Sequence, residues 1–154
     1  MLPKITKMLY ATDLSASASH AFGYALSLAV AHDAKISIIN VYEKLTNNVN
    51  FQQRNIDIAA AKAKLAEVVQ NRLAHYFRQE DPDECKYTRY IENIYVCAGS
   101  PVTAILDQAR QGGYDLIVMG THGHGFLYST LIGSNAQKMV QESKIPVLVV
   151  RLQD

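Results

Sequence analysis

Glycines recur in a short stretch near the C-terminal end of the chain, and their spacing is suited to binding phosphate. The stretch follows an apolar run and reads Gly-x-x-Gly at Gly120 and Gly123, then nine residues, then Gly133 and Ser134. Glycines let the backbone turn tightly and approach a ligand closely, while free N–H groups and a helix N-terminus supply partial positive charge. We therefore predict that this stretch binds phosphate.

This stretch differs from the two commonest phosphate-binding motifs. Asn135 follows Gly133 and Ser134, where a Walker A motif has Lys. After Gly123 and Gly125, the third glycine of a dinucleotide motif is also missing. A glycine-rich turn without a ligand is the alternative interpretation.

Two histidines within the stretch, His122 and His124, suggest a second chemistry. A His-x-His pair can bind zinc, but no other residues with ligand spacing accompany it. We expect one histidine to face the phosphates and the other to face solvent.

Two further residues at strand ends are expected to be structural. Cys97 is expected to be a small buried residue. Met119 is expected to belong to the core and also to border the ligand site at the end of its strand.

Composition limits the function classes. The chain has 154 residues, 49% of them apolar, and a net charge of +1, which fits one globular domain over residues 1–154. Lys and Arg are scattered, so no nucleic-acid surface is predicted. The longest weakly polar run, residues 21–31, is too short to span a bilayer, and the N-terminus lacks the apolar core of a signal peptide. Two cysteines form no disulfide framework. We expect a cytoplasmic protein without membrane insertion.

The elements that must position these residues alternate along the chain. Apolar runs predict strands at residues 5–11, 36–42, 90–98, 115–119 and 147–150. Helical periodicity predicts helices at 17–32 and 55–80, from Pro101 with Ser100 as N-cap to Gly112, and from Gly133 to about Ser143. Residues 43–54 have no clear period and are predicted to form a mobile loop. Alternating strands and helices predict an α/β fold with a parallel sheet and right-handed crossovers.

Ligands of such sheets bind beyond the carboxyl ends of the strands, where the strand order reverses. Asp13 follows the first predicted strand, and the Gly120 loop follows the fourth. If these two strands are neighbours, Asp13 and the loop meet in one crevice. Asp13 or Ser15 is also a good N-cap for the next helix, so a purely structural role for Asp13 remains open.

Three separated segments resemble the nucleotide-binding branch of the universal stress protein family. They are Tyr10–Ser15, the stretch from Ile117 through Gly133-Ser134, and Pro146–Val150. The resemblance covers nearly the whole chain, except the variable 43–54 region and the link at 81–86. It implies a single doubly wound, five-stranded parallel sheet of order 3-2-1-4-5, with helices on both faces and bound ATP.

By position, the resemblance also implies roles for individual residues. The phosphates and ribose would be held by Gly120, Gly123, Gly125, Gly133 and Ser134, with backbone donors from Asn135 and Ala136. Val41 would border the adenine, and Asp13 would contact the nucleoside or a metal ion, Mg²⁺ or Mn²⁺. Ala11 stands where the family often has proline, and a backbone contact would survive that change. The predicted site is completed by Thr12, Met119 and His122.

The predicted site residues are compatible with two functions. The first is a nucleotide-dependent regulator in the stress response, acting on an unknown protein partner. The second is an ATP hydrolase or a self-phosphorylating enzyme. The glycine loop contains no Lys or Arg to neutralise a transferring phosphoryl group, and no nucleophile is paired with a base. We therefore assign no catalytic residue and expect slow hydrolysis or none.

The last predicted strand is expected to mediate homodimerisation. Pro146–Val150 is apolar and carries no charge. In the implied order it lies at the edge of the sheet, where unpaired N–H and C=O groups favour pairing with another chain. The alternative is that a helix or the 151–154 tail covers this edge.

Overall fold

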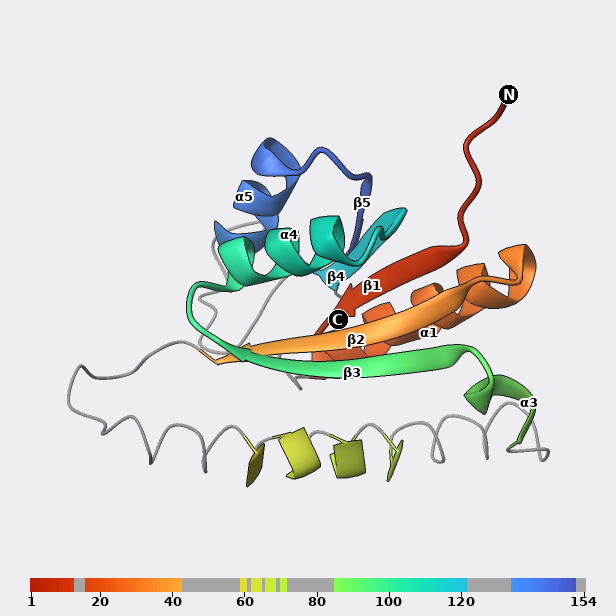
Figure 1. Ribbon diagram of the computed structural model, residues 1–154, viewed down its shortest axis with the longest axis horizontal. Coiled ribbons are helices and arrows are strands. Elements are labelled where there is room, and N and C mark those ends of the chain that lie inside the picture. Colours follow the sequence, from red (N-terminus) through yellow and green to blue (C-terminus); the bar gives the residue numbers. More distant parts are fainter. Residues whose placement is uncertain are drawn as a thin grey trace.

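Five parallel strands form the centre of the computed structural model (Figure 1). The structure describes residues 1–12, 16–42, 59–60, 62–64, 66–68, 70–71, 85–121 and 134–151. The strand order is β3-β2-β1-β4-β5, which confirms the predicted order. The strands are β1 (Lys7–Ala11), β2 (Lys35–Tyr42), β3 (Ile91–Ala98), β4 (Leu116–Gly120) and β5 (Val147–Val150).

The sheet reverses its order between β1 and β4. Met8 of β1 pairs with Ile36 of β2 on one side and with Leu116 of β4 on the other. The chain thus builds outward from β1 through β2 to β3, and then returns to the other side of β1 for β4 and β5. This confirms that strands one and four are neighbours, so their carboxyl ends lie side by side at the switch in strand order.

Helices cover both faces of the sheet (Figure 1). One face packs against α1 (Ala16–His32), and the other against α4 (Pro101–Gln111) and α5 (Ser134–Glu142). A short helix, α3 (Cys85–Thr88), precedes β3. The described residues between 59 and 71 are also helical. None of the helices in the described part of the chain combines the length and the apolar character needed to span a membrane.

The alternation of side chains along the central strands creates two cores. Met8 and Tyr10 of β1 pack on the α1 side, whereas Leu9 packs on the side of α4 and α5. Met8 and Leu9 are fully buried, as expected for a parallel strand covered on both faces. The helical stripes predicted from periodicity are largely confirmed. Buried stripe residues are Phe22, Ala25, Leu26 and Ala29 of α1 and Val102, Ile105 and Ala109 of α4, while Leu106 is half-buried.

Some local predictions were wrong. β1 begins at Lys7 rather than residue 5, and β4 at Leu116 rather than Asp115. The Asp115 carboxylate accepts hydrogen bonds from the residues just before and at the start of β1, so it ties the two strands together from outside β4. The third strand begins at Ile91 instead of Tyr90.

Helix predictions also needed corrections. Ser100 is the N-cap residue of α4, with Pro101 next to it, but the Ser100 side chain makes no capping hydrogen bond. Helical periodicity predicts that Ala59 and Ala63 lie on the apolar face of the 55–80 helix, yet both are exposed. The four-residue helix α3 was not predicted, because one helical turn is too short to show a period.

Candidate functional site

The carboxyl edge of the sheet brings three apolar predicted site residues onto one face. Ala11 ends β1, Val41 lies near the end of β2, and Met119 lies near the end of β4. All three belong to the core on the α4 and α5 side, where Met119 is 8% exposed and the other two are half-buried. Together they form an apolar wall next to the switch point, which suits the flat apolar face of a base.

The chain segments that leave β1 and β4 are fastened to neighbouring strands. The Thr12 N–H donates to the Ile39 carbonyl at 3.0 Å, and the Thr121 N–H donates to the Val150 carbonyl at 3.0 Å. Both threonines are buried. The backbone therefore enters both predicted ligand loops from fixed positions, which favours a preorganised site.

The start of α5 lies on the same face of the sheet. Ser134 and Asn135 are exposed, whereas Ala136 is 2% exposed and packs into the core that contains Met119. The first N–H groups of a helix have no partner within the helix and carry partial positive charge. No acidic residue stands in the first turn of α5 to compete for these groups. Ala136 thus anchors a helix start of the kind that can accept an anion.

The turn from β3 to α4 also reaches this edge. Gly99 has φ of +134°, a conformation that residues with a Cβ rarely adopt. Cys97, two residues earlier, pairs in register with Val41. Cys97 is half-buried rather than buried as predicted, because it lies next to the end of an edge strand, where the last residue, Ala98, is exposed. Burial raises the pKa of the Cys97 thiol.

Several predicted site residues lie outside the described residues. These are Asp13, His122, Gly123, Gly125 and Gly133, together with His124 of the zinc alternative. Gly120 is described and ends β4. Among the described residues, no group of three or more His, Cys, Asp or Glu side chains is placed to hold a metal ion.

One polar residue near the site was not singled out from the sequence. Asn40 is 5% exposed, and its Nδ2 donates to the Thr12 carbonyl at 2.8 Å. The available signal was its place in the β2 sequence, where a buried amide interrupts the otherwise apolar Ile-Ile-Asn-Val run. The strand pattern alone does not show which group the amide contacts.

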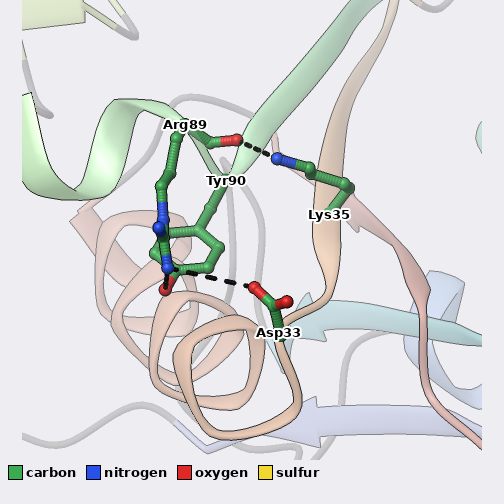
Figure 2. Close-up of polar contacts among 4 residues, drawn as sticks. All are labelled: Asp33, Lys35, Arg89 and Tyr90. Carbon is green, nitrogen blue, oxygen red and sulfur yellow. Dashed lines mark hydrogen bonds and ion pairs between the residues drawn. The ribbon is translucent and has the colours of Figure 1, made fainter.

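A cluster of charges lies at the opposite, amino edge of the sheet (Figure 2). The Arg89 guanidinium donates to the Tyr90 hydroxyl at 2.7 Å and stacks 4.7 Å from the centre of its ring. Asp33 lies 3.9 Å from the same guanidinium, and Lys35 Nζ donates to the Arg89 carbonyl. These contacts tie the residues before β3 to the start of β2. Because all strands are parallel, the cluster is separated from the candidate site by the length of the sheet.

The chain thus forms a doubly wound α/β domain, and in domains of this class ligands bind at the switch point of the sheet. The chain matches the universal stress protein family over residues 4–151, and it belongs to that family.

A relative agrees with this assignment, and solved structures share the fold. A universal stress protein of Thermus aquaticus is 33% identical over 146 residues, which cover 94% of this chain and 97% of the relative. Universal stress protein UspA from Lactobacillus plantarum superposes with a TM-score of 0.68 at 24% identity, covering 97% of this chain and 100% of that one. A universal stress protein in complex with cAMP superposes with a TM-score of 0.64 at 25% identity, covering 96% and 98%.

Proposed function

We propose that the protein binds ATP at the carboxyl edge of its sheet and acts as a nucleotide-dependent regulator in the cytoplasm. The observation that carries the proposal is that Ala11, Val41, Met119 and Ala136 lie on the same face of the sheet as the start of α5. An apolar wall beside an anion-binding helix start matches the two ends of a nucleotide. The cAMP complex of a family relative supports an adenine nucleotide as the ligand class.

In this proposal the adenine lies against Val41 and Ala11, and the phosphates lie at the glycine loop and the start of α5. The loop donors are Gly120, Gly123, Gly125 and Gly133, and the helix donors are Ser134, Asn135 and Ala136. Thr12, Met119 and His122 border the nucleotide. Asp13 contacts the nucleoside or a bound Mg²⁺ or Mn²⁺, which would neutralise phosphate charge.

Regulation without fast hydrolysis agrees with the charges at this edge. Among the described residues next to the switch point there is no Lys or Arg; these residues are 11–12, 41–42, 97–100, 119–121 and 134–136, and the exposed Arg151 follows β5 farther along the same edge. Phosphoryl transfer normally requires cations that stabilise the developing charge. A steady-state turnover well above about 1 s⁻¹, ordinary for enzymes, would favour the alternative of an ATP hydrolase or self-phosphorylating enzyme.

The binding test begins with the purified protein. Denaturing it and analysing the supernatant shows whether a nucleotide co-purifies, and calorimetry with ATP, cAMP and GTP in magnesium then compares affinities. Gly133→Val should abolish ATP binding, because its side chain occupies the proposed phosphate position, and should leave the fold intact. Ala31→Val adds the same side chain at an exposed position of α1 and should bind ATP normally. Absence of both retained nucleotide and heat with ATP or cAMP would refute the proposal.

The same proposal includes a homodimer formed through β5. This strand lies at the edge of the sheet, and residues 147–149 are only half-buried. Val140 of the adjacent α5 is 58% exposed, which adds apolar surface near that edge. Pairing of two identical edges would satisfy the free backbone groups of both chains.

A further inference from the structure

An exposed arginine, Arg151, follows β5 at the carboxyl edge of the sheet. Gly120, the last residue of β4, pairs in register with Val150, and the Val150 carbonyl accepts a hydrogen bond from the Thr121 N–H at 3.0 Å. That carbonyl belongs to the planar peptide group that joins Val150 to Arg151. The backbone at Arg151 therefore lies about 4.8 Å, one strand spacing, from the chain where it leaves β4.

Arg151 also follows the residues of β5 that pack on the side of the proposed site. Val147 and Val149 belong to the core that contains Ala136 of α5, whereas Val150 packs on the α1 side. Side chains alternate along a strand, and position 151 is the next in the series of 147 and 149. The start of α5 lies at the same edge, because α5 follows β4 and β5 follows α5. Arg151 is thus placed beside the elements that would hold the phosphates.

The guanidinium of Arg151 is not neutralised within the described part of the chain. The ion pairs found there join Arg89 to Asp33 and Arg110 to Asp107, and neither includes Arg151. A guanidinium donates N–H groups in a planar fork that matches two oxygens of a phosphate. An arginine at this position can therefore bind the anionic end of a ligand.

The strand order gives the direction in which a nucleotide would lie along this edge. In the proposed function the adenine lies at Val41 of β2 and Ala11 of β1, and the phosphates begin at Gly120 of β4. The next strand in the order is β5. From β2 to β5 there are three strand spacings, about 14 Å. An extended nucleoside triphosphate can cover this span, whereas a monophosphate is too short.

We propose that Arg151 binds the terminal phosphate of ATP and thereby selects triphosphates over monophosphates. The inference rests on the proposed function, because it assigns a specificity-determining residue to that same site. Arg151 contributes affinity and selectivity rather than turnover, since phosphoryl transfer needs a positioned nucleophile as well as cations.

Calorimetry with ATP, AMP and adenosine in magnesium tests this role. Arg151→Gln removes the charge and the fork and keeps a polar side chain. It should weaken ATP binding about fivefold, the effect of one solvent-exposed charged contact, and leave AMP and adenosine binding unchanged. Arg151→Lys keeps the charge without the fork and should bind ATP with intermediate affinity. The difference between wild type and Arg151→Gln should shrink as salt rises from about 0.1 M to about 1 M, because salt screens an exposed contact.

Arg110→Gln is the matched control, because Arg110 is exposed and lies in the last turn of α4, at the amino edge of the sheet. The substitution removes the same group at the far end of the strands, so ATP binding should be normal. The inference is wrong if Arg151→Gln binds ATP like the wild type or loses adenosine affinity equally. It is also wrong if Arg110→Gln weakens ATP binding as much, or if the wild type binds AMP as tightly as ATP. A wild type that binds no adenine nucleotide would instead overturn the proposed function, and the inference with it.

Discussion

Asp115 provides the sharpest test of how the two central strands are held together. Its Oδ2 accepts three hydrogen bonds, from the Thr6 N–H at 2.8 Å, the Thr6 hydroxyl at 2.9 Å and the Lys7 N–H at 2.9 Å. These bonds join the start of β4 to the start of β1 across more than 100 residues of sequence. Asp115→Asn keeps the shape of the side chain and removes its charge.

The expected loss follows from the strength of these bonds. Hydrogen bonds to a charged group contribute about 1.5–3 kcal/mol each and neutral ones about 1 kcal/mol, but exposure to water reduces the difference. Thr6 is exposed and Asp115 is half-buried, so we expect Asp115→Asn to lower the free energy of unfolding by about 1–2 kcal/mol in total. For a domain of this size, the melting temperature should fall by about 3–6 °C.

The effect should depend on pH with a definite sign. Burial acts to raise the pKa of Asp115, but hydrogen bonds from Thr6 and Lys7 outweigh it, so the pKa lies below its ordinary value. A carboxylate whose folded pKa is lowered stabilises the fold above its unfolded pKa, about 4, and loses this effect as the pH falls through the folded value. The stability difference between wild type and Asp115→Asn should therefore be full at neutral pH and shrink below about pH 4.

Urea unfolding of both proteins at pH 7 and at pH 3 measures this difference. Asp107→Asn is a suitable control, because Asp107 forms an exposed pair with Arg110 at 3.3 Å within one helix. That control should change stability by less than about 0.5 kcal/mol. An Asp115→Asn protein as stable as wild type at pH 7, or a difference that grows on acidification, would refute the reasoning.

Three further predictions concern packing, reactivity and assembly. Gly112→Ala should lower the free energy of unfolding, measured with urea, by about 1–3 kcal/mol, because the added Cβ would lie 2.3 Å from Cε2 of the Tyr114 ring. An unchanged free energy of unfolding would contradict this contact. Cys97 should be alkylated more slowly than a free cysteine at pH 7.5, since burial raises its pKa, and equal rates would count against that. Val149→Lys should sediment as a monomer or aggregate, whereas the wild type should sediment as a dimer; a wild type that is monomeric at every concentration would exclude the β5 interface.

The sequence by itself predicted most of the elements, and it also predicts a phosphate site, which stays a prediction. Strands such as β4 are buried apolar runs, and the stripe Val102, Ile105 and Ala109 has the period of one helix face. Both signals depend on residues that are close in the chain. The glycine spacing that predicts phosphate binding is also local, which is why it could be recognised without coordinates. The strand order required the family resemblance, because local periodicity does not specify which strands are neighbours.

Only the tertiary structure decided which distant residues support the site. Asp115 ties β4 to β1, and Asn40 holds the carbonyl of Thr12, through bonds that span 109 and 28 residues of sequence. In the sequence each is one polar residue beside or within an apolar strand, and nothing local identifies its partner. Ser100 shows the same limit, because its type and position favour a cap but its side chain makes no capping bond. A hydrogen bond depends on where two groups lie in space, and for groups far apart in the chain that is determined by the packed sheet.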